Sequence, residues 1–135
     1  MRLLLLLLPL GLFADVNLLC GNAVWKITDD IFEETDHEYV VTINERLKKV
    51  TVPDYENMRY EEKGAELTFR AAVKVQNKNG LTVFTLNRIS GVLLEENWIS
   101  DAEYDDMDEV ERFDTKGHIE IFTYKLQCEK VEPLF

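Results

Sequence analysis

The residues best suited to chemistry in this chain are acidic, and they gather in one segment. Residues 100–114 read SDAEYDDMDEVERFD and contain eight carboxylates. Carboxylates at this density could hold calcium, but an EF-hand loop needs glycine where Asp106 stands and glutamate where Arg112 stands. At most a weak, nonspecific cation site is left, so we expect neither a bound metal nor a cofactor.

The same segment could instead recognise a protein with a basic surface. Tyr104 has acidic neighbours on both sides, a setting that resembles the tyrosine sulfation sites of secreted proteins. A dense anion of this kind attracts arginine-rich surfaces. The alternative is a solvated loop that repulsion between like charges keeps extended and mobile. The predicted partner-binding residues are Asp101, Glu103, Tyr104, Asp105, Asp106, Asp108, Glu109 and Glu111.

Catalytic signatures do not occur in the sequence. Neither His37 nor His118 lies in a motif with a serine or cysteine nucleophile, and phosphate loops, nucleophile elbows and zinc-protease motifs are missing. Acidic residues are too numerous to single out one acid and one base. We therefore expect a protein that is not an enzyme, with His118 as an ordinary surface histidine. A small hydrolase built from scattered residues is the alternative.

The net charge narrows the choice of partners. The 135 residues include 26 acidic and 15 basic side chains, which gives a formal net charge of −11. This charge opposes a phosphate backbone, so we expect no nucleic-acid partner. It favours attraction to basic protein surfaces.

The first residues have the organisation of a secretion signal. Met1-Arg2 precedes an apolar run at Leu3–Phe13, which is too short to span a bilayer. The small residues of Gly21-Asn22-Ala23 suit a cleavage site. This pattern predicts a leader at 1–23 and a single secreted, extracellular domain at 24–135.

The state of the two cysteines depends on that cleavage site. A leader that ends at Ala23 removes Cys20 and leaves Cys128 as a lone thiol, which is the predicted state. Cleavage after Ala14 is the alternative. Cys20 and Cys128 could then tie the N-terminus to the last strand.

The clearest structural pattern is a β-hairpin at Ala65–Arg88. Apolar and polar residues alternate on both sides of Asn79-Gly80, the strongest short signal for a type I′ turn. With the turn at these two residues, Val75 would lie opposite Phe84 and Val73 opposite Leu86. The inward face could also line a site for an apolar ligand, formed by Phe69, Val73, Val75, Phe84 and Leu86.

Other segments also favour strands. Residues 37–43, 47–52 and 118–128 are rich in strand formers, whereas 55–64 reads as a polar loop and 24–35 as a short helix or extended lead-in. We therefore predict a mainly β fold, a curved antiparallel sheet or barrel with at most short helices. Sequence does not distinguish a filled barrel from a hollow one.

The order of these segments resembles the N-terminal β-barrel region of the large lipid-transfer proteins, the vitellogenin and lipophorin group. The resemblance rests on Glu38-Tyr39-Val40 as a first strand, the alternating strand Ala65–Gln76, its partner LTVFTLNRISGVLL, and the acidic loop. It implies a barrel that binds a receptor or other protein partner and a lipid or small apolar ligand. The helical region and large sheets of that family have no counterpart in this sequence, so bulk lipid transport is not expected.

Two other secreted folds lack their characteristic residues here. A lipocalin opens with Gly-x-Trp, but Trp25 is preceded by Ala23-Val24, and a cystatin needs a Gln-x-Val-x-Gly loop that VKVQNKNG does not supply. The sequence thus predicts a secreted, non-enzymatic binding protein without a membrane span. The alternative is a secreted effector of venom or salivary type that acts through the acidic segment.

Overall fold

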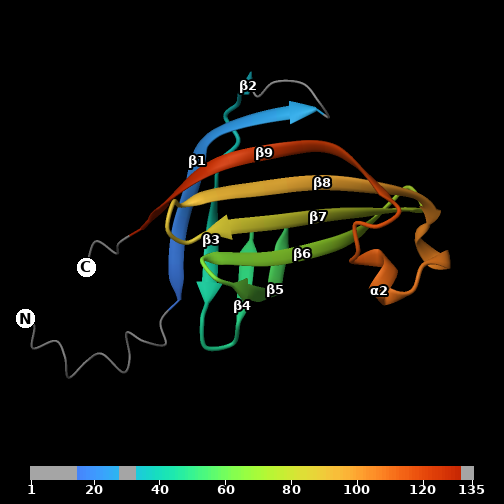
Figure 1. Ribbon diagram of the computed structural model, residues 1–135, viewed down its shortest axis with the longest axis horizontal. Helices are drawn as coiled ribbons and strands as arrows, with labels where there is room; N and C mark the ends of the chain where they lie inside the picture. Colours follow the sequence, from blue (N-terminus) through green and yellow to red (C-terminus); the bar gives the residue numbers. More distant parts are fainter. Residues whose placement is uncertain (1–14, 28–32, 132–135) are drawn as a thin grey trace, which may run out of the picture.

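The computed structural model describes residues 15–27 and 33–131 of the chain (Figure 1). Most of these residues form strands, and two short helical turns interrupt them, η2 (Tyr104–Asp106) and α2 (Glu109–Arg112). The strands are β1 (Val16–Ile27), β2 (Glu33–Glu34), β3 (Tyr39–Asn44), β4 (Lys49–Val52), β5 (Tyr55–Lys63), β6 (Glu66–Val75), β7 (Lys78–Asn87), β8 (Val92–Glu103) and β9 (His118–Lys130).

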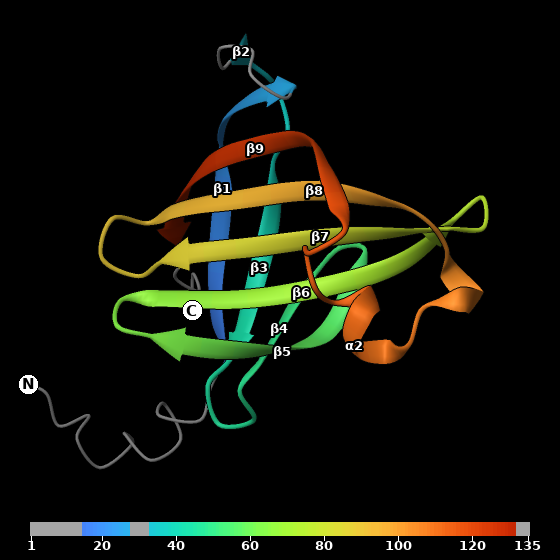
Figure 2. The same ribbon diagram turned by 45° about the vertical axis from the view of Figure 1, so that its right-hand side comes forward.

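The strands form a closed antiparallel barrel. From β3 to β9 each strand pairs with the next along the chain, β1 pairs with β3, and the pairing of β1 with β9 closes the ring of eight. The two-residue strand β2 pairs with β1 outside this ring. In Figure 2, β5–β9 lie side by side across the front, and β1, β3 and β4 cross behind them. The predicted mainly β fold, with at most short helices, is confirmed.

The hairpin of β6 and β7 has a different register from the predicted one. Its turn residues are Gln76 and Asn77, whose φ angles of 50° and 75° suit a type I′ turn. Phe69 consequently lies opposite Phe84, whereas the predicted register pairs Phe84 with Val75. The two registers differ by an even number of residues, so the predicted faces of the strands are kept. The observed register stacks Phe69 on Phe84, with ring centroids 5.0 Å apart.

Asn79-Gly80 lies within β7 and does not form the turn. A Cβ atom on Gly80 would lie 3.2 Å from Val75 Cγ2 and 3.3 Å from Val73 Cγ1. The glycine therefore leaves room for two valines of the neighbouring strand. Asn79 is fully buried and donates from Nδ2 to the carbonyl of Arg112 at 3.1 Å, which fastens α2 to the outside of β7.

β1, β5 and most of β8 lie where the sequence predicts no strand. β5 occupies the segment that was expected to be a polar loop, and only its Met58 and Tyr60 are buried. With so few apolar positions, its period of two is difficult to recognise. β1 occupies residues that the sequence assigns to the leader and the lead-in, and Leu18 packs against the core.

A disulfide joins the two strands that close the barrel. Cys20 of β1 and Cys128 of β9 lie directly opposite each other and are bonded. The predicted lone thiol at Cys128 is therefore wrong, and the alternative pairing is the one observed.

The residues of the predicted cleavage site form a bulge within β1. Asn22 has a φ of 49°, and Ala23 is buried, with its carbonyl accepting a hydrogen bond from Thr35 N. The pairing of β1 with β3 involves Val16–Cys20. Cleavage after Ala23 would remove that part of β1, whereas cleavage after Ala14 would leave the strand whole.

The apolar run Leu3–Phe13 lies outside the described residues. In the part of the chain that the structure describes, no helix is long and apolar enough to cross a membrane.

Candidate functional site

The inward-facing side chains change from apolar to polar along two neighbouring strands, β7 and β8. On β7 the inward positions run from Leu86 through Phe84 to Thr82. On β8 they run from the fully buried Leu93 to Glu95 and Asn97. The apolar ends of both runs belong to a packed core, and the polar ends line a cavity of about 380 Å³. The barrel is thus filled in one region and hollow beside it.

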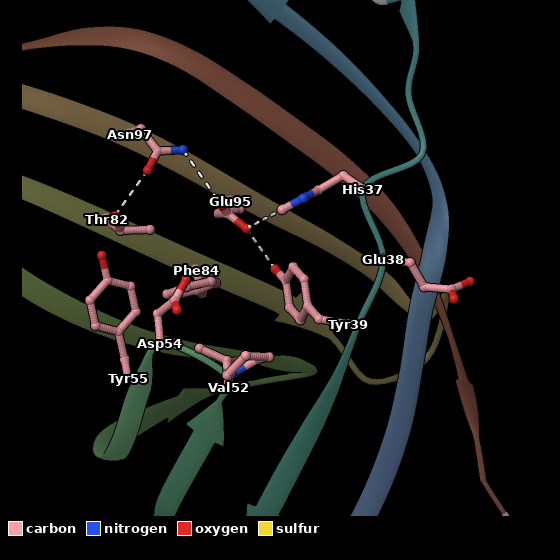
Figure 3. Close-up of a pocket in the computed structure, with 11 residues that line it drawn as sticks. His37, Glu38, Tyr39, Val52, Asp54, Tyr55, Thr82, Phe84, Glu95 and Asn97 are labelled. Carbon is pink, nitrogen blue, oxygen red and sulfur yellow. Dashed lines mark hydrogen bonds and ion pairs between the residues drawn. The ribbon is translucent and has the colours of Figure 1, made fainter.

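The carboxylate of Glu95 is the centre of this cavity wall (Figure 3). The hydroxyl of Tyr39 donates to Glu95 Oε1 at 2.7 Å, and Nε2 of His37 lies 3.2 Å from the same oxygen. Both residues come from the segment that leads into and begins β3, and their spacing of two places them on the same side. The Glu95 side chain is only 12% exposed. A nearly buried carboxylate of this kind needs hydrogen-bond donors, and the two residues supply them.

A second set of hydrogen bonds extends from the other oxygen of Glu95. Asn97 Nδ2 donates to Glu95 Oε2 at 3.3 Å, and the Thr82 hydroxyl donates to Asn97 Oδ1 at 2.9 Å. This chain fixes which way the Asn97 amide points. Because Thr82 and Asn97 lie opposite each other on β7 and β8, the barrel wall itself sets the geometry.

Burial keeps Tyr39 and Tyr124 neutral. Burial, and after it the charge of Glu95, raises the pKa of Tyr39 far above its ordinary value near 10. The same two causes, in the same order, raise the pKa of Tyr124. Tyr39 is therefore a permanent hydrogen-bond donor to Glu95 and contributes no charge at physiological pH.

Aromatic rings form two walls beside Glu95. On one side His37 stacks on Tyr124 at 3.9 Å between centroids and meets Tyr39 edge-on at 5.1 Å. On the other side Tyr55 meets Phe84 edge-on at 6.5 Å. His37, Tyr39, Tyr55 and Phe84 are among the lining residues, so their rings offer apolar surface to whatever enters the cavity, and Tyr124 stacks on His37 without lining it.

The charged residues that line the cavity are mainly acidic. Glu38, Asp54 and Glu95 line it, whereas none of the described lining residues is lysine or arginine. In Figure 3 the side chain of Glu38 turns away from Glu95 towards β1. Its Oε2 would lie 2.8 Å from a Cβ atom on Gly21, so this glycine makes room for it. The cavity therefore has a negative charge at its wall and another, Asp54, at the turn between β4 and β5.

The predicted apolar-ligand face is divided between different environments. Phe69, Phe84 and Leu86 are 1–2% exposed and belong to the packed core, and of these three Phe84 alone borders the cavity beside Glu95. Val73 and Val75 are partly exposed and line a smaller cavity of about 240 Å³. The five residues therefore do not form one continuous ligand surface.

A further cavity lies at the opposite end of the core. It also has a volume of about 380 Å³, and its walls are largely apolar, with Leu18, Ile43 and Leu86 among them. Val16, at the start of β1, borders it. It lacks a buried polar centre comparable to Glu95 among its described lining residues.

The acidic segment is anchored to the barrel and is not a plain extended loop. Asp108 caps α2 by accepting from Glu111 N at 2.8 Å, and the Glu111 side chain accepts from Asp108 N in return. The guanidinium of Arg112 lies 3.9 Å from the ring centroid of Tyr104 and donates to the Tyr104 carbonyl. Met107 is buried beside them. The segment therefore contains two short helical turns, η2 and α2, and is not the extended loop of the alternative interpretation.

Basic side chains partly neutralise this segment. Lys74 lies 3.3 Å from Asp105, and Lys78 lies 3.8 Å from Glu103. All seven predicted acids remain exposed: Asp101, Glu103, Asp105, Asp106, Asp108, Glu109 and Glu111. Tyr104 is half-buried.

His118 is buried, so its expected surface position is wrong. Its Nε2 lies 2.7 Å from Asn79 Nδ2, the same amide nitrogen that donates to the Arg112 carbonyl. Because that nitrogen is a donor, Nε2 acts as acceptor and the ring proton lies on Nδ1. The Arg112 carbonyl accepts from the Asn79 amide and the Thr115 carbonyl accepts from His118 N, contacts that the sequence around His118 alone does not indicate.

Sequence reasoning missed the site around Glu95. The signal that could have found it is a glutamate at an inward position, two residues after Leu93 in the same strand. In the sequence His37 stands out only as a possible catalytic residue, and Tyr39 only as part of a strand.

Comparison with known proteins adds no family assignment. No family model matches the chain, and no curated protein or solved structure is similar to it.

Proposed function

We propose that this protein is a secreted, non-enzymatic binding protein whose barrel holds a small organic ligand. The observation that carries the proposal is the cavity beside the packed core, with one nearly buried carboxylate held by three donors on its wall. Its volume of about 380 Å³ falls at the lower end of the range of ligand sites, roughly 300–1,000 Å³. Few polar groups, fixed in place among aromatic rings, are typical of sites that bind by shape and orientation.

The hydrogen bonds of the cavity favour binding over catalysis. A nucleophilic hydroxyl needs a base that takes its proton. The Thr82 hydroxyl donates to an amide oxygen, and the Tyr39 hydroxyl donates to a carboxylate whose proximity disfavours loss of the proton. His37 contacts neither hydroxyl in a way that would activate it, because its Nε2 is directed at Glu95.

Secretion and the origin of the barrel remain parts of this proposal. Disulfides persist mainly in oxidising compartments, so the Cys20–Cys128 bond supports an extracellular protein. We propose that a leader ends at Ala14, because β1 then stays intact. N-terminal sequencing of the secreted protein should begin at Asp15, and a start at Val24 would contradict this boundary. The resemblance to the lipid-transfer proteins is likewise proposed on segment order, since a barrel occurs in many families.

Ligand binding is tested best by filling the cavity. A Thr82→Trp substitution places a large ring in the space, and Thr85→Trp places the same ring on the opposite, outer face of β7 as a control. We expect native mass spectrometry of the secreted protein to show a bound small molecule that Thr82→Trp loses and Thr85→Trp keeps. Equal occupancy in both variants, with both folded by circular dichroism, would place the ligand elsewhere.

A second candidate function is protein recognition by the acidic segment, which the exposed acids support. In the described residues Asp106, Asp108 and Glu109 form no ion pair, so their charges are available to a basic partner. Changing Asp105, Asp106, Asp108 and Glu109 to amides should weaken binding of an arginine-rich peptide and reduce its salt dependence. The melting temperature should hardly change, because asparagine also caps a helix. Unchanged peptide binding and an unchanged salt response would contradict this function.

A further inference from the structure

One oxygen of Glu95 has spare capacity to accept a hydrogen bond. A carboxylate has about four lone-pair positions. Oε1 is used by Tyr39 at 2.7 Å and by His37 at 3.2 Å, whereas Oε2 receives a single long bond of 3.3 Å from Asn97. Oε2 is therefore the atom of this network that a ligand can engage.

The surroundings of this oxygen favour a donor that carries a positive charge. No lysine or arginine is found among the described residues that line the cavity, and Asp54 adds a second carboxylate. Tyr39 and Asn97 are neutral donors, so they solvate the charge of Glu95 without cancelling it. A carboxylate that is 12% exposed and has no permanent cation nearby gains most from a charged hydrogen-bond donor.

The aromatic walls favour an organic cation over an inorganic one. Among the residues that line the cavity, the rings of His37 and Tyr39 lie on one side of the carboxylate and those of Tyr55 and Phe84 on the other (Figure 3). Ring faces attract ammonium groups and also cover apolar carbon. The described residues contain no group of three or more histidine, cysteine or acidic side chains arranged to hold a metal ion.

We propose that the cavity binds a small organic cation, a protonated amine on an aromatic or short apolar body, with the ammonium group donating to Glu95 Oε2. This inference rests on the proposed function, because it names the ligand class of the same cavity. The volume of about 380 Å³ restricts the ligand to a small molecule. The net charge of −11 raises the local concentration of cations around the protein and speeds their approach.

The test compares two probes of nearly the same shape on the secreted protein. Calorimetric titration with 2-phenylethylamine and with 2-phenylethanol separates the charge from the apolar body. We expect the amine to bind at least tenfold more tightly. Glu95→Gln, which keeps an oxygen for Tyr39, should reduce amine affinity at least tenfold. Glu96→Gln is the matched control, because Glu96 lies next in sequence on the outer face of β8, and it should leave the affinity within twofold.

The outcomes separate this inference from the proposed function. If the alcohol binds as tightly as the amine, or if Glu95→Gln changes amine affinity less than twofold, the cavity is a small-molecule site for a different class and the cation inference is wrong. If neither probe binds and the secreted protein also shows no ligand that Thr82→Trp removes, both proposals are wrong. The comparison of amine and alcohol on the unmodified protein decides the question even if Glu95→Gln fails to fold.

Discussion

Glu95 and Glu96 are neighbours in sequence, but they lie on opposite faces of the barrel wall and have different surroundings. Glu96 is half-buried on the outside, where the Thr123 hydroxyl donates to neighbouring Glu120 at 2.5 Å. Burial, and after it the charge of Glu120, raises the pKa of Glu96 above its ordinary value of 4.5, although Arg70 and Lys26 oppose the shift. Its ionised form is therefore less stable in the folded protein than in the unfolded chain.

Replacing Glu96 should therefore stabilise the protein at neutral pH. Because the pKa of Glu96 is higher in the folded protein than in the unfolded chain, protonated Glu96 favours the folded state. This contribution to the free energy of unfolding is complete below pH 4.5, the pKa in the unfolded chain, and is lost as the pH rises through the folded-state pKa. Glu96→Gln should increase the free energy of unfolding at pH 7 by up to about 1 kcal/mol, a modest gain because water screens a half-exposed pair. The gain should vanish near pH 4. Urea unfolding at both pH values measures it, and a loss of stability at pH 7 would contradict the pKa direction.

Tyr39 should affect stability in two separable ways. Tyr39→Phe removes a hydrogen bond to a carboxylate, which should lower the free energy of unfolding at pH 7 by about 1.5–3 kcal/mol. Because the folded pKa of Tyr39 is raised, the unmodified protein should also lose stability as pH rises above 10. The variant should lose less over that range. Parallel urea titrations at pH 7 and 10.5 provide the measurement, with Tyr104→Phe as the control for a tyrosine on the outer segment.

At the scale of elements, the turn between β6 and β7 provides a direct test of register. Gln76 holds a φ of 50°, a conformation that costs a residue with a side chain about 1–2 kcal/mol. Glycine avoids this cost but loses about 0.5–1 kcal/mol through its greater freedom in the unfolded chain. Gln76→Gly should therefore stabilise the protein by roughly 0.5–1 kcal/mol.

The matched substitution is Gly80→Ala, which the predicted register would place in the turn. In the observed register the added Cβ would lie 3.2 Å from Val75 Cγ2 and 3.3 Å from Val73 Cγ1, so these two side chains must shift. Both valines are partly exposed and have room to move, so the cost should be about 1 kcal/mol. Thermal melts of the two variants decide between the registers. A destabilised Gln76→Gly together with a strongly destabilised Gly80→Ala would favour the turn at Asn79-Gly80.

In the β6–β7 hairpin, the sequence predicts the faces of the strands but not their register. Alternation in β6 and β7 predicts correctly which residues share a face, because the side-chain period is a local property of a strand. The register depends on whether Phe84 packs on Phe69 or on Val75, and this choice involves residues distant in sequence. In QNKNG two turn positions are available, so the local signal alone does not decide.

The sequence does not predict strand β5 or the site around Glu95, and both omissions have the same physical cause. β5 is recognisable only after β4 and β6 are in place, since Met58 and Tyr60 are its only buried residues. Glu95 likewise looks like one acid among many until β3 brings Tyr39 to it from 56 positions away. Composition and alternation predict the fold class. The site combines residues from strands far apart in the sequence, so it can be recognised only after the barrel has been assembled.

At the scale of the whole molecule, the seam between β1 and β9 should be a major determinant of stability. The Cys20–Cys128 bond links residues 108 positions apart, so it restricts nearly the whole unfolded chain. Replacing both cysteines by serine should lower the free energy of unfolding by about 3–4 kcal/mol. Urea unfolding of the double variant, compared with the oxidised parent, measures this loss. Equal stability would show that strand pairing alone holds the seam.

The same bond makes the segment between the two cysteines a covalent ring. A protease that cuts once in the exposed acidic segment would leave both fragments attached, so the nicked protein would keep its full mass on a gel until a reductant is added. The first and last described residues also lie near each other, since Val131 N donates to the Asn17 carbonyl at 2.8 Å. A short linker from Val131 to Asp15 would therefore allow new termini to be opened between η2 and α2 while the cavity on the inner side of the wall stays intact.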